Sequence, residues 1–337
     1  MKKIIVLTLL LCVPLATVPS LKAAGSLQQK RPSAKAWLVI DQASGQILRH
    51  NNSRLKLPIA STTKLLTALA VVRNGHLDSW VTISAKAANQ VPSKAGLRVG
   101  EKWRRRDLLK ALLIKSANDS ATALAESVSG GEAAFCRKLN ALAKQLGCRH
   151  SNIRRASGLP ASGQYSTAAD LAIILKKAMS ESYIKTILSW KSVKVRSKKG
   201  RVLSFYSKNK FLNRSSSVVK GKTGYTRRAK LCFAGSMEIS NKKYSVVFLG
   251  SNNLWSDLGL LRSWTVKFEN SIRFNESRLT KVQKIKWQKY LNKKGLSAGS
   301  ADGIWGPKTQ KAFLKFQKSK KLTEDGLVGP QAWKSMS

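Results

Sequence analysis

The sequence predicts an α/β domain followed by a small helical domain. Strand-like segments lie near both ends of the first 270 residues, and segments with helical spacing of apolar side chains lie between them. A sheet built in this way takes its edge and its centre from distant parts of the chain. A short repeat, Asp302-Gly303 to Pro307 and then Asp325-Gly326 to Pro330, marks the second domain, because Gly-Pro ends one element and allows a helix to begin at the proline.

The elements of the first domain follow in order. Residues 36–41 and 46–50 are strand-like and flank a turn at Ala43-Ser44-Gly45, which predicts a hairpin. Residues 61–72 carry apolar side chains at helical spacing, so Ser61 lies in the first turn of a helix. The other expected elements are helices at 107–114, 119–128, 132–146 and 167–179 (with Thr167 as N-cap), strands at 192–196, 202–206, 218–223, 230–238 and 244–251, a closing helix at 254–266, and a helix at 309–317 in the second domain.

The N-terminus has the pattern of a secretory signal peptide. Lys2 and Lys3 precede an apolar run and then small residues that end at Ala24. The run is shorter than the ~20 residues that span a bilayer, so we expect cleavage and no transmembrane segment in the mature chain, with a retained N-terminal anchor as the alternative. The expected domain boundaries are a signal peptide at 1–24, a linker at 25–33, the main domain at 34–270, a linker at 271–278 and the second domain at 279–337.

The chain is strongly basic. Its formal net charge is +46, and removal of residues 1–24, which hold three lysines and no acid, leaves +43. Such a charge favours polyanions, namely nucleic acid, anionic lipid headgroups or an acidic wall polymer. Export argues against nucleic acid as a partner. A merely solvated basic surface is an equally weighted alternative, since charge alone does not locate a site.

The cysteines and histidines predict neither a metal site nor a cofactor. Cys136, Cys148 and Cys232 form an odd set in the mature chain, so at least one thiol is unpaired, and we expect buried, inert thiols. The three histidines of the chain have no ligand spacing with cysteine or with one another.

Three strings carry candidate chemistry, and the first is Ser61-Thr62-Thr63-Lys64. Side chains three apart on a helix share a face, so Lys64 can reach Ser61 and act as its base. This requires that burial or a second cation, for which Lys222 is the candidate, lowers the pKa of Lys64. The Ser-x-x-Lys pattern occurs at five other places in the chain, so by itself it does not identify a catalytic serine.

The other two strings are Ser116-Ala117-Asn118 and Lys222-Thr223-Gly224. The Ser116 hydroxyl can relay a proton, and the Asn118 amide can hold a substrate backbone. Lys222-Thr223 offers a charge and a hydroxyl to a carboxylate, and Gly224 allows close approach of a ligand backbone. Each string alone is more simply a turn or a solvated strand end.

The joint pattern resembles the low-molecular-mass D-alanyl-D-alanine carboxypeptidases, which are penicillin-recognising serine enzymes, over about residues 34–268. Residues 279–337 are similar to a three-helix peptidoglycan-binding module, through both Asp-Gly turns. The resemblance implies a serine β-lactamase/D,D-transpeptidase-like fold with an antiparallel sheet flanked by helices. The matching segments are Asp41 to Gly45, Pro58 to Thr67, Gly100-Glu101, Leu112 to Asp119, Ala156 to Pro160, Tyr165 to Asp170 and Lys222 to Thr226.

The resemblance also implies a set of roles. Ser61 attacks the carbonyl between two terminal D-alanines and forms an acyl-enzyme, Lys64 takes the serine proton, and Ser116 passes a proton to the departing D-alanine. The remaining implied roles are substrate binding by Asn118, Lys222, Thr223 and Gly224, and an oxyanion hole built from the backbone N–H groups of Ser61 and Tyr225.

The implied partners are peptidoglycan stem peptides and the glycan polymer, with β-lactam antibiotics as covalent inhibitors, in the periplasm or at the cell wall. A D,D-endopeptidase acting on cross-links is the nearest alternative, and a non-catalytic wall-binding protein is the alternative from another class. The chain departs from the family at Val219-Lys220-Gly221, where relatives usually carry an acid and a glycine, and at Arg227 and Arg228. These departures leave the substrate preference open.

Overall fold

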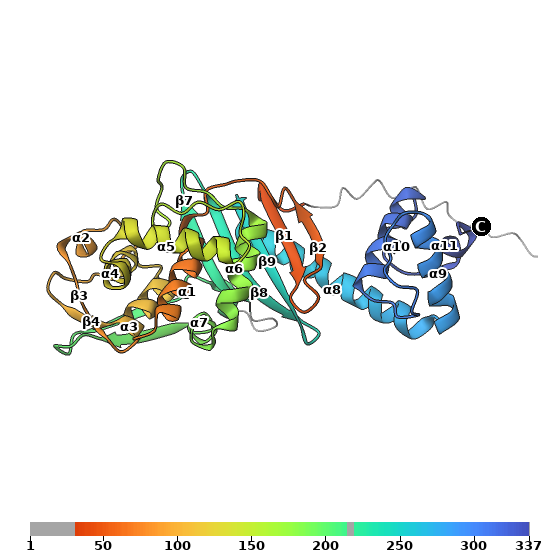
Figure 1. Cartoon of the computed structure of the whole chain (residues 1–337). Coiled ribbons are helices and arrows are strands. Elements are labelled where there is room, and N and C mark those ends of the chain that lie inside the picture. The colour runs from red at the N-terminus through yellow and green to blue at the C-terminus, as the bar shows by residue number, and fades with distance from the viewer. Residues whose placement is uncertain (1–30, 214–218, 337) are drawn as a thin grey trace, which may run out of the picture. The chain divides into compact units, whose positions relative to one another are not determined.

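The computed structural model describes residues 31–213 and 219–336, and its centre is a five-stranded antiparallel sheet (Figure 1). The strand order is β2-β1-β9-β8-β7, so the N-terminal hairpin lies beside strands that come some 200 residues later. The predicted sheet, with its edge and centre from distant segments, is confirmed. Its strands are β1 (Ala36–Asp41), β2 (Ile47–Asn51), β7 (Lys220–Thr226), β8 (Lys230–Ile239) and β9 (Lys242–Ser251).

Both faces of the sheet are buried, because alternate side chains of the apolar central strands enter two different cores. From β1, Leu38 enters the core shared with the helices α1, α4, α5 and α6, whereas Val39 enters the core shared with α8. In Figure 1, α6 and α8 accordingly lie on opposite faces of the sheet. The bounds are α1 (Lys64–Asn74), α4 (Asn118–Ser129), α5 (Glu132–Gln145), α6 (Ala168–Ser180) and α8 (Leu254–Arg278).

The predicted helices are present, with one irregularity. Thr167 caps α6 by accepting a hydrogen bond from the Asp170 N–H. The expected helix at 107–114 is instead α3 (Arg105–Lys110) followed by a π turn, η2 (Ala111–Lys115). The smaller elements are η1 (Ala60–Thr63), β3 (Trp80–Thr82), α2 (Ala85–Ala88), β4 (Lys102–Arg104), α7 (Ser182–Ile187), the hairpin β5 (Ser192–Arg196) and β6 (Val202–Tyr206), and η3 (Lys210–Asn213).

Residues 271–278, which we expected to be a linker, are helical, because α8 continues through them to Arg278. Polar side chains in this stretch are buried rather than solvated. Asn275 is fully buried, and its Nδ2 donates to Gln310 Oε1 at 3.0 Å and to the Gly326 carbonyl at 2.7 Å. The last turns of α8 therefore belong to the packing of the C-terminal domain.

The C-terminal domain consists of three helices, α9 (Lys281–Lys293), α10 (Pro307–Ser319) and α11 (Pro330–Lys334). Both Gly-Pro steps of the repeat begin a helix, as predicted from the sequence. Trp287 packs edge to face against Phe313 and against Phe316 in a small aromatic core. Aromatic side chains bury a large apolar area each, so this short domain has a core of its own.

The expected signal peptide lies outside the described residues. Within the described ranges, no helix has both the length and the apolarity needed to cross a bilayer. Cys136, Cys148 and Cys232 are buried and unpaired, as predicted, and burial raises the pKa of Cys148 and of Cys232 to about 12. These thiols are protonated at neutral pH, which makes them poor nucleophiles.

Candidate active site

The short turn η1 holds Ser61 directly in front of α1. Thr62 and Thr63 each donate a hydroxyl hydrogen bond back to a carbonyl of the preceding turn. Gly158 packs against the same turn with φ of +78°, and a Cβ built there would lie 2.0 Å from the Ala60 carbonyl oxygen. Only glycine fits this position, so the 156–160 segment braces the nucleophile turn from behind.

Lys64 is fully buried beneath Ser61. Its Nζ lies 3.1 Å from Ser61 Oγ, 2.8 Å from Asn118 Oδ1 and 2.6 Å from the Ser157 carbonyl oxygen. A neutral amine can donate to the last two acceptors and turn its lone pair toward the serine hydroxyl. Among the described residues, no other Ser-x-x-Lys pair is joined by a side-chain hydrogen bond, so the geometry singles out Ser61 and Lys64.

The pKa of Lys64 is lowered well below its ordinary value, first by burial and then by the charge of Lys222. Removal of an ammonium from water penalises the charged form, and a nearby cation adds to the penalty. Lys64 is therefore suited to accept the proton of Ser61. The predicted requirement for burial and a second cation is present in the structure.

The π turn places Ser116 opposite this pair. Its last hydrogen bond runs from the Ser116 N–H to the Ala111 carbonyl, and Ser116 itself adopts a left-handed conformation with φ of 64° and ψ of 38°. Non-glycine residues adopt this region at an energetic cost and are enriched at functional sites. The Ser116 side chain is thereby aimed at β7 instead of continuing along the helix.

Lys222 meets Ser116 from the sheet side. Its Nζ donates to Ser116 Oγ at 2.9 Å and to the Thr223 carbonyl at 2.8 Å. Burial, followed by the charge of Lys208, lowers the pKa of Lys222 to about 7. This lysine is therefore poised between its charged and neutral forms near neutral pH.

Asn118 is the first residue of α4, and its amide is already engaged within the protein. Its Oδ1 accepts from Lys64 Nζ at 2.8 Å, and its Nδ2 donates to the Val91 carbonyl at 3.0 Å. In this arrangement Asn118 orients the Lys64 side chain. Its expected role in holding a substrate backbone stays a prediction.

Gly224 brings β7 against the nucleophile turn. A Cβ at this position would lie 2.9 Å from the Ser61 backbone nitrogen and 3.1 Å from that of Thr62. The strand can approach η1 this closely only because the residue is glycine. The backbone of Lys222-Thr223-Gly224-Tyr225 therefore borders Ser61, which is the neighbourhood required for the expected oxyanion hole.

A cavity of about 520 Å³ opens over these groups. It has no acidic side chain in its wall, and Lys64 and Lys222 lie beneath its surface. Six of the eight predicted site residues line the cavity, namely Ser61, Ser116, Asn118, Thr223, Gly224 and Tyr225.

Sequence reasoning missed two further parts of this wall. Lys208 lines the cavity, donates from Nζ to Ser93 Oγ at 3.3 Å, and lowers the pKa values of both buried lysines. Trp255 also lines the cavity and packs against Phe211 with a centroid distance of 5.3 Å. No local pattern marks Lys208 among the many lysines of the chain, and Trp255 lies in a segment whose only signal is helical.

Comparisons with known proteins give a family for each domain. The family model for D-alanyl-D-alanine carboxypeptidase matches residues 23–253, and that for a peptidoglycan binding domain matches residues 285–336. The D-alanyl-D-alanine carboxypeptidase DacF of Bacillus subtilis is 30% identical over 224 residues, which are 65% of this chain and 58% of that protein. A D-alanyl-D-alanine carboxypeptidase of Mycobacterium tuberculosis is 31% identical over 249 residues, which are 72% of this chain and 85% of that protein.

A relative with a different named activity is equally similar. The D-alanyl-D-alanine endopeptidase of Pseudomonas aeruginosa is 32% identical over 271 residues, which are 76% of this chain and 86% of that protein. Among solved structures, a D-alanyl-D-alanine carboxypeptidase from M. tuberculosis matches with a TM-score of 0.67 and 29% identity, over 72% of this chain and 94% of that chain. The DD-transpeptidase of a Streptomyces strain matches with a TM-score of 0.65 and 26% identity, over 70% of this chain and 97% of that chain. The expected D,D-transpeptidase-like fold is confirmed.

Proposed function

This chain belongs to the D-alanyl-D-alanine carboxypeptidase family of serine peptidases, and on that basis we propose that it removes the terminal D-alanine from peptidoglycan stem peptides through an acyl-enzyme on Ser61. The observation that carries the proposal is the 3.1 Å contact between Ser61 Oγ and the Nζ of the buried Lys64. A serine hydroxyl needs such a base to act as a nucleophile.

In the first half of the reaction, neutral Lys64 takes the Ser61 proton while Oγ attacks the carbonyl carbon between the two D-alanines. The backbone N–H groups of Ser61 and Tyr225 stabilise the resulting oxyanion, at about 3–4 kcal/mol for each donor. The C–N bond then breaks, and Ser116, held by Lys222, gives its proton to the leaving amine and is reprotonated by Lys64, which becomes neutral again. The products of this half are an ester on Ser61 and free D-alanine.

In the second half, a water molecule attacks the ester carbonyl from the open cavity. Lys64, again neutral, accepts the proton of this water and passes it to Ser61 Oγ as the ester bond breaks and the shortened peptide leaves. Lys222 and Thr223 bind the carboxylate of the terminal D-alanine in the first half. The lack of acidic side chains in the cavity wall and the charge of Lys208 favour an anionic substrate there.

A second candidate function is cleavage of peptide cross-links as a D,D-endopeptidase. The similarity to the Pseudomonas endopeptidase favours it. The same residues would act, and the leaving amine would belong to a second stem peptide. The contact between nucleophile and base argues against the non-catalytic alternative.

The proposed arrangement along the chain is a signal peptide at 1–24, a catalytic domain at 34–270 and a peptidoglycan-binding domain at 279–337. The short segment 25–33 would link the first two. We propose that the mature protein is exported to the periplasm or the cell wall, where β-lactams acylate Ser61. The match of the last domain to a peptidoglycan-binding family supports this location.

A fluorescent penicillin tests the proposal. The wild-type protein should form a covalent adduct that the Ser61→Ala variant lacks, whereas Ser182→Ala, which changes an exposed Ser-x-x-Lys serine, should keep it. A folded wild type that forms no adduct would falsify the enzyme assignment. Release of D-alanine from a pentapeptide without cleavage of a cross-linked dimer would select the carboxypeptidase, and the opposite result would select the endopeptidase.

A further inference from the structure

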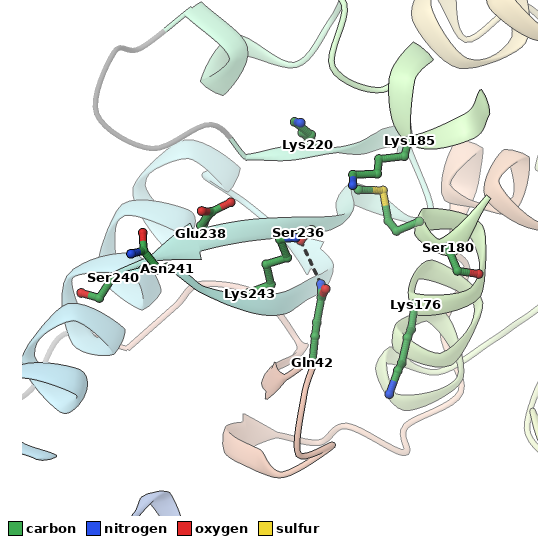
Figure 2. Close-up of a pocket in the computed structure, with 11 residues that line it drawn as sticks. Gln42, Lys176, Ser180, Lys185, Lys220, Ser236, Glu238, Ser240, Asn241 and Lys243 are labelled. Carbon is green, nitrogen blue, oxygen red and sulfur yellow. Dashed lines mark hydrogen bonds between the residues drawn. The ribbon is translucent and has the colours of Figure 1, made fainter. Parts of the chain in front are cut away.

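A second cavity, of about 660 Å³, lies on the α6 face of the sheet, and none of the candidate catalytic residues lines it (Figure 2). Its walls come from α6, α7 and the strands β7, β8 and β9. Four lysines line it, each from a different element, and we call this cavity the lysine groove. They are Lys176 of α6, Lys185 of α7, Lys220 of β7 and Lys243 of β9.

The charge of the lysine groove is unbalanced. Glu238 is the one acidic residue in its wall, and it pairs across the strands with Lys243 at the hairpin end. Figure 2 shows Glu238 beside Ser240 and Asn241, apart from Lys185 and the α6 helix. Among the described residues, no carboxylate lies within 4 Å of any of the four ammonium groups, although eight such ion pairs occur elsewhere.

Like charges that converge on one concavity repel one another and attract an anion. A cleft lined by one sign of charge also focuses the field and raises the local concentration of an oppositely charged ligand. Ordered polar groups accompany the lysines. Gln42 Nε2 donates to Ser236 Oγ at 2.9 Å and to Ser245 Oγ at 3.2 Å, which fixes this amide in the wall of the groove.

The position of the groove relates it to the catalytic site. Lys220 and Lys222 are two residues apart on β7, so their Cα atoms are separated by roughly 7 Å and their side chains leave the same face of the strand. Lys222 belongs to the catalytic site, whereas Lys220 lines the groove. A polymer held at one site therefore has its neighbouring segments close to the other.

We propose that the lysine groove binds the free carboxylates of a second stem peptide of the polymer on which the enzyme acts. This proposal rests on the proposed function, because a polymer of stem peptides with free carboxylates is the anion that the enzyme's own reaction supplies. The amides and hydroxyls that line the groove match the polar groups of a peptide backbone. The groove thus holds a neighbouring strand and increases the residence of the enzyme on the polymer without taking part in the reaction.

The test uses a fluorescein-labelled stem tetrapeptide that ends in D-alanine with its carboxylates free. Its fluorescence anisotropy is measured on full-length mature protein whose catalytic site has been acylated by penicillin. The groove variant is Lys176→Gln/Lys185→Gln/Lys243→Gln, in which all three changed side chains are exposed. The matched control, Lys86→Gln/Lys144→Gln/Lys199→Gln, loses the same charge at exposed lysines outside both cavities.

The groove variant should bind the peptide at least tenfold more weakly than the wild type, and the control variant should stay within twofold. A peptide with amidated carboxylates should also bind at least tenfold more weakly. Equal losses in the two variants, or equal binding of the amidated peptide, would overturn the proposal. Binding of tripolyphosphate but not of the peptide would assign the groove to phosphate instead.

Failure of the proposed function would be recognised separately. In that case penicillin would not acylate the wild type, and the same titrations would be made on the Ser61→Ala chain. A difference in peptide affinity between the groove variant and the control variant would then still show whether the groove binds the peptide.

Discussion

Lys222 Nζ and Ser116 Oγ lie 2.9 Å apart, although the two residues are separated by 106 positions in the chain. One residue comes from the sheet and the other from the turn between two helices. The proposed carboxylate dock is therefore in direct contact with the proposed proton relay. Substrate binding at Lys222 and proton transfer at Ser116 are expected to depend on each other.

The first prediction concerns the pH dependence of activity. The pKa of Lys222 is lowered to about 7, so this lysine loses its charge as the pH rises above neutral. We expect kcat/KM for a pentapeptide to fall above pH 7, since this ratio reports the free enzyme. In Lys222→Arg the guanidinium stays charged, so the alkaline fall should move upward by more than one pH unit, as measured by D-alanine release. If the alkaline fall of kcat/KM stays at the same pH in Lys222→Arg, the fall is caused by the titration of another group.

The second prediction concerns the pH dependence of stability. The folded-state pKa of Lys222 is below the value of about 10.4 in an unfolded chain, so between these values the unfolded state binds the additional proton. The free energy of unfolding therefore rises with pH over the window from about 7 to 10.4. We expect the Tm to increase from pH 7 to pH 9.5, and to increase less in Lys222→Met, by scanning calorimetry. An equal increase in both proteins would contradict this.

The third prediction concerns the close approach of β7 to Ser61. In Gly224→Ala the new Cβ must displace the Ser61 and Thr62 backbone nitrogens by a few tenths of an ångström. We expect penicillin acylation to slow by about 100-fold or more, which is the effect of losing one oxyanion donor. Gly259→Ala is the control, because its Cβ meets nothing within 4 Å in α8, and it should leave acylation unchanged and raise stability by about 0.5–1 kcal/mol. Normal acylation in Gly224→Ala would show that the turn can move freely.

The fourth prediction compares two ion pairs. Glu101 accepts both hydrogen bonds of Arg201 Nη1, at 2.7 and 3.0 Å, and both side chains are partly buried. Glu101→Ala leaves a half-buried guanidinium without its partner and should lower the free energy of unfolding by roughly 1–3 kcal/mol. Asp78→Ala removes an exposed partner of Arg104 and should cost under about 1 kcal/mol, by urea denaturation. A larger loss of stability in Asp78→Ala than in Glu101→Ala would show that burial does not determine the size of the effect.

The fifth prediction concerns binding to the wall. Trp287 is fully buried in the aromatic core of the C-terminal domain. Trp287→Ala should destabilise this domain by about 3–5 kcal/mol and weaken co-sedimentation with insoluble peptidoglycan at 0.15 M salt, which is about physiological. Penicillin acylation should persist, because the change lies outside the catalytic domain. Val282→Ala, at a position 75% exposed, is the control and should sediment normally. Unchanged sedimentation of Trp287→Ala would assign wall binding to the charge of the catalytic domain.

The sequence was sufficient to predict the sheet, most helices and the convergence of the three strings. These features depend on local signals, namely alternation in the strands, the Thr167 cap and the Gly-Pro helix starts. The resemblance to the carboxypeptidase family then supplied the long-range proximity of the three strings, which local patterns do not give. The burial of Lys64 could be predicted, because a lysine base needs a lowered pKa. Its contact with Ser157 could not be predicted, because the acceptor is a backbone carbonyl, which every residue has.

The remaining features could not be predicted, for physical reasons that differ. Residues 271–278 are polar and were therefore expected to be a linker, but their side chains are satisfied by distant groups such as Gln310. Lys208 lowers the pKa values of Lys64 and Lys222 because it lies near them, and this proximity exists only in the folded chain. The π turn at 111–115 could not be distinguished from an ordinary helix, because it is built from the same apolar residues that an α-helix would carry at these positions.

That extra residue in the π turn also bears on how such an enzyme can be lost. The turn closes with a hydrogen bond spanning five residues instead of four, and the left-handed Ser116 follows from this closure. Deletion of a single leucine from the turn would let the helix continue regularly and would rotate Ser116 away from Lys222. A descendant could thus keep every catalytic side chain and still be inactive. The number of residues in this turn must therefore be preserved, as well as the identity of the catalytic residues.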